Sequence, residues 1–173
     1  MKKLKTLVTS AIVLVMLMGM AATANAWTLF LPIQGFHKNV ERALLREKYE
    51  EPQEAKEYWA KAAELGEELL ESNAERTSYL IGTARAYYGL GEYEKSIGLY
   101  EKIIEIKKAQ KVEDIAADYP WVYVYLGLAN AKLGNNADAV KYWKQVPQKI
   151  GPVYNSIQEQ IGVLEGKQTA AVQ

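Results

Sequence analysis

The chain has 173 residues, with 21 Lys and Arg against 21 Asp and Glu, one His and no Cys. The absence of cysteine excludes disulfides, thiolate zinc sites and a cysteine nucleophile, and a single histidine cannot form a multi-histidine metal site. Zero net charge gives none of the basic excess that nucleic-acid-binding proteins usually carry, so no nucleic-acid partner is expected.

Residues 1–26 have the three parts of a secretory signal peptide. Three lysines among the first five residues are followed by an apolar run through Met20, and the segment ends in Ala-Asn-Ala, an A-x-A cleavage site. The run is shorter than the roughly 20 apolar residues of a spanning helix. We therefore expect cleavage after Ala26 and export, with a bacterial periplasm as the setting. The alternative is an uncleaved membrane anchor.

After the predicted cleavage site the pattern is helical, without the sustained alternation of β-branched residues that is typical of strands. Residues 27–36 are apolar and uncharged, and we expect them to cap the helices that follow; docking on a membrane or a partner is the alternative. Helices are predicted over 37–49, 53–71, 74–89, 93–110, 120–133, 136–146 and 153–164. Short connections place neighbouring helices antiparallel, which makes the fold all-α. The small, polar residues 166–173 are expected to form a flexible tail.

Proline and glycine mark the ends of these predicted helices. Pro52 and Pro120 stand where a helix begins, because the first turn tolerates a residue without an N–H group. Gly91 and Gly134 stand where a helix ends, because glycine adopts the left-handed conformation of a helix C-terminus at little cost.

Two stretches, 80–104 and 123–147, repeat one pattern of small and aromatic residues. The aligned pairs are Gly91 with Gly134, Ala84 with Gly127, Ser96 with Ala139, Tyr100 with Trp143, and Ile103 with Val146. Small side chains let two helices approach closely, and an aromatic side chain one turn later fills the space between adjacent hairpins. A weaker copy lies upstream, where Ala55, Trp59 and Ala62 have the same spacing.

The pattern resembles the tetratricopeptide repeat, whose first helix reads W-x2-L-G-x2-Y and whose second helix carries small and aromatic residues. The family repeats every 34 residues or so. Gly91 and Gly134 are further apart, so extra residues fall in 107–119. We expect this insert to be an extended, solvated helix and loop; a dedicated docking element is the alternative.

The resemblance implies a short solenoid of stacked helical hairpins over residues 37–165, with the first helix of each hairpin lining the concave side. Members of the family generally bind peptides or partner helices there. We therefore predict a non-catalytic interaction module or scaffold of the bacterial cell envelope, with a protein or peptide partner. The predicted contact residues are Ile81, Arg85, Tyr88, Trp121, Val124, Leu128 and Lys132.

Charge and aromaticity suggest roles for four of these residues. Arg85 and Lys132 would meet a carboxylate of the partner, and Tyr88 and Trp121 would supply flat apolar contacts. The alternative is that the two basic side chains are simply solvated and that Trp121 is packed under its neighbour.

The sequence contains no recognisable catalytic motif. His37 is isolated, and adjacent carboxylates such as Glu67 and Glu68 diverge on a helix. Neither G-x-S-x-G, a Gly-rich phosphate loop nor H-E-x-x-H occurs. We expect no enzymatic activity, no cofactor and no metal. The alternative function is a small-ligand or cargo-binding protein of a periplasmic transport or assembly system, with tyrosines and tryptophans around a closed cavity. Self-association through the repeat ends is a third hypothesis.

Overall fold

The computed structural model describes the backbone of residues 32–171 and the side chains of residues 32–166. Within that part of the chain every regular element is a helix and no strand occurs, as predicted. The predicted signal peptide and residues 27–31 of the predicted cap lie outside the described residues.

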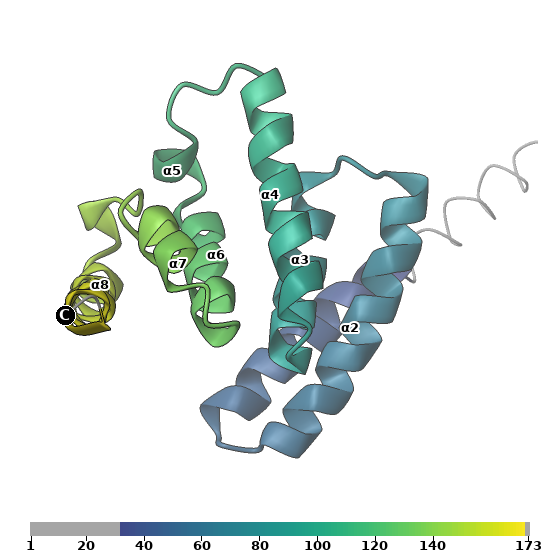
Figure 1. The fold of residues 1–173 in the computed structure, drawn as a ribbon. Coiled ribbons are helices and arrows are strands. Elements are labelled where there is room, and N and C mark those ends of the chain that lie inside the picture. Colours follow the sequence, from purple (N-terminus) through teal and green to yellow (C-terminus); the bar gives the residue numbers. More distant parts are fainter. Residues whose placement is uncertain (1–31, 172–173) are drawn as a thin grey trace, which may run out of the picture.

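Residues 32–48 form the first described helix. The elements that follow are α2 (Pro52–Ser72), α3 (Thr77–Leu90), α4 (Tyr93–Ala109), α5 (Ile115–Asp118), α6 (Pro120–Lys132), α7 (Asn136–Trp143), a 3-10 turn (Gln148–Ile150) and α8 (Pro152–Ala171). Contacts join α2 to α3, α3 to α4, α4 to α6, α6 to α7 and α7 to α8, so the helices stack in chain order. Figure 1 shows α3 and α4 in the middle, with α2 on one side and α6 and α7 on the other.

The helix ends follow the proline and glycine signals. Pro52 and Pro120 occupy the first turns of α2 and α6. Gly91 and Gly134 have φ angles of 86° and 80°, in the left-handed region where a side chain would strain the backbone. These turns reverse the chain between α3 and α4 and between α6 and α7, which produces the predicted antiparallel hairpins.

The structure differs from the prediction at both ends of the described chain. The first helix already includes residues 32–36, and Phe36 is only 1% exposed, packed beside Gly66, Gly82 and Tyr79. The expected boundary between cap and repeat domain therefore falls inside a core-forming helix. At the other end α8 continues to Ala171, past the predicted end at 164, because no proline interrupts the chain and most of the residues that follow are good helix formers.

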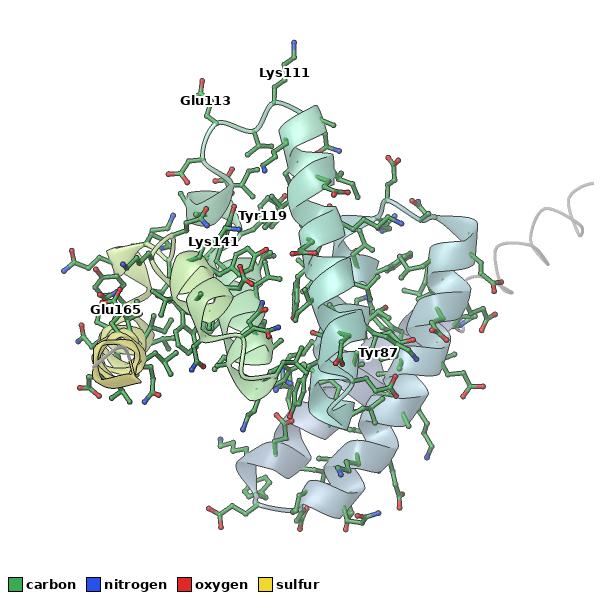
Figure 2. All side chains as sticks on the ribbon, in the orientation of Figure 1. Tyr87, Lys111, Glu113, Tyr119, Lys141 and Glu165 are labelled. Atoms are coloured by element: carbon green, nitrogen blue, oxygen red, sulfur yellow. The ribbon has the colours of Figure 1, made fainter. Side chains whose placement is uncertain are left out.

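The insert 107–119 folds back onto the protein instead of remaining an extended, solvated helix and loop. The chain leaves α4 after Ala109, and Lys111 reverses it with a φ angle of 56°. The Asp114 side chain accepts a hydrogen bond from the Ala117 N–H at 2.8 Å and so caps α5, whose Ile115 is buried in the core. Figure 2 shows Lys111 and Glu113 projecting from the outer tip of this connection. Only the tip of this connection therefore has the extended, solvated form that was expected for the whole insert.

Two tryptophan–glycine contacts hold helices close together in the core. Trp59 of α2 lies on Gly89 of α3, and Trp143 of α7 lies on Gly127 of α6. A Cβ atom at either glycine would come closer than 3.0 Å to the indole ring. The Trp143 indole N–H also donates a hydrogen bond to the Val124 carbonyl at 3.2 Å. The pairing of a small residue in one helix with an aromatic residue in the next is therefore a packing requirement.

Candidate functional site

A cavity of about 470 Å³ lies between the first described helix, α3 and α6. These are the first helices of the three hairpins, and we call the cavity the first-helix pocket. Its walls are formed mainly by Val40, Leu44, Ile81, Arg85, Trp121 and Tyr125. Each helix contributes two of these side chains one turn apart, so both point to the same face.

Arg85 lines this pocket and is already paired within the protein. Its Nη2 atom donates a hydrogen bond to the Glu47 carboxylate at 2.6 Å, and its side chain is only 13% exposed. The guanidinium carbon lies 4.7 Å from the ring centroid of Trp59, 5.3 Å from that of Tyr88 and 4.9 Å from that of Tyr125. The prediction that Arg85 is free to meet a partner's carboxylate therefore has to be corrected, because Glu47 supplies that carboxylate.

Three buried donors at the pocket have no hydrogen-bond partner in the described part of the chain: Arg85 Nε, Arg85 Nη1 and the Tyr100 hydroxyl. Tyr100 is 1% exposed and stacks on Tyr125 with ring centroids 5.8 Å apart. Burial raises the pKa of Tyr100, so its hydroxyl remains a neutral donor at physiological pH. Because an unsatisfied buried donor is unfavourable, this floor favours an occupant that brings an acceptor.

The structure gathers three of the predicted contact residues, Ile81, Arg85 and Trp121, around one pocket. Trp121 is 49% exposed, so it is not packed under its neighbour. Tyr88 lies next to the pocket, with its ring centroid 5.4 Å from that of Tyr125. Burial is the main cause of a raised pKa at Tyr88, so this ring also stays neutral.

The other three predicted residues do not reach the pocket. Val124 is 3% exposed and belongs to the core beside α7, so its prediction as a groove contact is wrong. Leu128 is half-buried against the same core, and Lys132 is exposed at the end of α6. Val124 is turned away because it lies about 100° around the helix from Tyr125, whereas Leu128 and Lys132 share the face of Trp121 and Tyr125 but lie further along α6.

The sequence profile of the tetratricopeptide repeat matches residues 79–106 and 121–149, which are the α3–α4 and α6–α7 hairpins. The chain is a tetratricopeptide repeat protein. The resemblance seen in the sequence is thereby confirmed, together with the all-α repeat fold. No curated protein matches the chain. Tetratricopeptide repeats generally mediate protein–protein interaction and are typically non-catalytic.

The first hairpin of this tetratricopeptide repeat protein, residues 32–72, lies outside the matched segments but supplies two apolar residues of the pocket's wall. Val40 and Leu44 line the pocket, and Glu47 holds Arg85. Sequence reasoning missed these residues, although Val40 and Leu44 lie on one helical face. Tyr125 could have been found in the same way, one turn from Trp121. The pairing of Glu47 with Arg85 joins positions 38 residues apart, and no local pattern indicates it.

A second, polar crevice of about 480 Å³ lies between α4 and α7. Its lining carries charges of both signs, including Glu101, Glu105, Lys108 and Lys141, and the Tyr142 hydroxyl donates to Glu101 at 2.7 Å. In residues 32–166 no three His, Asp or Glu side chains are grouped so as to hold a metal ion. No helix in the described part of the chain is long and apolar enough to cross a membrane.

Proposed function

We propose that this tetratricopeptide repeat protein is a non-catalytic interaction module or scaffold of the bacterial cell envelope, and that it captures a peptide or helix in the first-helix pocket. The observation that carries the proposal is the pocket itself. Its volume of about 470 Å³ is in the range of roughly 300–1,000 Å³ that is common for binding pockets. It lies on the helices that line the binding side of such solenoids.

Exposed apolar side chains support binding at this position. Leu44 and Trp121 are 45% and 49% exposed, and both line the same pocket. Large exposed apolar side chains gathered at one cavity are typical of interaction sites, and tryptophan is among the residues that most often dominate binding energy. A main-chain carbonyl of the bound segment would suit the unpartnered donors of Arg85 and Tyr100.

The small-ligand alternative is less well supported by the same pocket. A ligand that is held through purification needs an enclosed cavity, whereas Leu44 and Trp121 leave these walls open to solvent. Native mass spectrometry of the purified protein distinguishes the two functions. A stoichiometric small molecule that survives desalting would favour the alternative.

Site-specific photocrosslinking in the producing cell tests the proposed function. A benzoylphenylalanine residue replaces Trp121 in one strain and Tyr49 in another. Tyr49 is 63% exposed and does not line the pocket, so it is the matched control. We expect discrete protein adducts from position 121 that are absent at position 49. Equal adduct patterns at both positions, or none at 121, would refute capture in this pocket.

The envelope setting rests on the signal-peptide pattern of residues 1–26. Cell fractionation followed by intact-mass measurement tests it. We expect the protein in the envelope fraction with a mass that begins at Trp27. A cytoplasmic protein that retains residues 1–26 would refute this part of the proposal.

A further inference from the structure

One carboxylate at the first-helix pocket has no ionic partner among the described residues. Asp118 is the last residue of α5, lines the pocket and is exposed. None of the ion pairs formed among residues 32–166 includes it. Its side chain therefore presents a free negative charge beside Trp121.

The other charges around the pocket do not offset Asp118. Arg85 is paired with Glu47 at 2.6 Å, and the same carboxylate accepts the Trp59 indole N–H at 2.9 Å. Lys107 is buried outside the lining, where its ammonium donates to Gln110 at 3.0 Å. Of the two charged residues in the lining, Arg85 is therefore neutralised by Glu47, whereas Asp118 has no such partner.

Lys132 is too far from the pocket to neutralise the charge of Asp118. It lies on α6 roughly 16 Å from Trp121 along the helix axis, from the 1.5 Å rise per residue. That separation exceeds the Debye length of about 8 Å at physiological ionic strength.

We propose that the partner segment carries a lysine or arginine next to the large apolar side chain that fills the first-helix pocket, and that this cation pairs with Asp118. The inference rests on the proposed function and specifies its partner. It reverses the expectation that Arg85 attracts an acidic partner. An acidic segment would approach Asp118 and the partly exposed Glu47, whereas a basic segment finds a carboxylate that no other described residue neutralises.

Selection from a phage-displayed library of random peptides, on the order of twelve residues long, tests the charge preference. The full chain serves as bait in four forms: wild type, Asp118→Lys, Trp121→Ala and Asp138→Lys. Asp138 is an exposed aspartate on α7 that does not line the pocket, so its reversal is the matched control. Far-UV circular dichroism establishes that all four baits are folded.

We expect wild type and Asp138→Lys to enrich peptides with Lys or Arg beside a bulky apolar residue. Asp118→Lys should instead enrich Asp or Glu at that position, and Trp121→Ala should enrich nothing above background. The best wild-type peptide should bind Asp118→Asn about twofold to fivefold more weakly by fluorescence anisotropy, the range for exposed ion pairs.

The outcomes separate this inference from the proposed function. If Asp118→Lys retains the basic preference, or if wild type selects neutral or acidic peptides that Trp121→Ala loses, the partner chemistry is wrong and capture in the pocket stands. If folded wild type selects nothing, or if Trp121→Ala selects the same peptides, the proposed function is wrong as well.

Discussion

Replacing Gly127 with alanine should destabilise the wild-type protein but stabilise a Trp143→Ala variant. In the wild type a Cβ atom at Gly127 would lie less than 3.0 Å from atoms of the Trp143 indole, a separation that Cβ atoms essentially never show. Both residues are buried, and Trp143 is 2% exposed, so neither helix can relieve the overlap without moving. Overpacking of this kind costs about 1–3 kcal/mol.

In the Trp143→Ala variant the effect of Gly127→Ala on stability should change sign, because the indole ring that would collide with the added methyl group is absent. That substitution alone should cost about 3–5 kcal/mol, through lost burial and a cavity between α6 and α7. It also removes the hydrogen bond from the indole N–H to the Val124 carbonyl. In this background the methyl group that Gly127→Ala adds occupies vacated space, and alanine is favoured over glycine in a helix interior by about 1 kcal/mol.

Urea denaturation followed by far-UV circular dichroism measures all four proteins of this double-mutant cycle. The coupling free energy between the two positions should be about 2–4 kcal/mol, which is the net loss of about 1–3 kcal/mol that Gly127→Ala causes in the wild type added to the net gain of about 1 kcal/mol in Trp143→Ala. If Gly127→Ala destabilises both backgrounds equally, the contact between indole and glycine does not limit the approach of α6 and α7. An unchanged stability of Trp143→Ala would show that Trp143 is not a core residue.

Three further predictions concern the first helix, the Arg85 pair and the buried tyrosines. Phe36→Ala should cost about 3–5 kcal/mol, because Phe36 is 1% exposed; a loss below about 1 kcal/mol in urea denaturation would show that residues 32–36 are peripheral. Arg85→Glu should cost about 2 kcal/mol or more, because it breaks an ion pair and places a carboxylate beside Glu47, whereas the exposed control Lys132→Glu should stay within about 0.5 kcal/mol by the same measurement. Burial raises the pKa values of Tyr87 and Tyr142, and so do the hydrogen bonds that their hydroxyls donate to Glu67 and Glu101, respectively. Both hydroxyls therefore stay protonated at a pH at which the tyrosines of the unfolded chain lose their protons. Stability should therefore fall as the pH rises above about 10, and ultraviolet absorbance should show fewer phenolates in the native protein than in urea at the same pH; equal ionisation would contradict the burial of these rings.

Much of the fold could be predicted because its signals are local. Pro52 and Pro120 set helix starts, and Gly91 and Gly134 set helix ends, each through the conformational limits of a single residue. The alignment also singled out Gly127 and Trp143 as packing residues, but it placed the aromatic side chain between adjacent hairpins, whereas Trp143 lies on Gly127 within one hairpin. The part played by Phe36 was missed because its partners, Gly66 and Gly82, belong to other helices and no repeat spacing relates them.

Only part of the candidate site could be predicted, because the sequence does not specify how a helix is rotated or which distant residues pair. Residues of α3 and α6 were correctly placed on the first helices, but Val124 was assigned to the wrong face, since one residue rotates a helix by about 100°. The partnership of Arg85 with Glu47 depends on how the first helix stacks on α3, which composition and periodicity do not specify. Asp118 belongs to a four-residue helix within the irregular insert, where no repeat pattern applies.

The ion pair between Glu47 and Arg85 limits which fragments of this chain can fold by themselves. The two matched repeats contain Arg85, but its carboxylate partner and the Trp59 ring beneath its guanidinium belong to the preceding hairpin. A fragment that starts at α3 would keep the cation while losing both groups that accommodate it, and it would expose Tyr79 and Ala86, which pack against the first hairpin. Dissection at the boundaries of the recognisable repeats should therefore yield a fragment that is less stable and less soluble than the chain with all three hairpins.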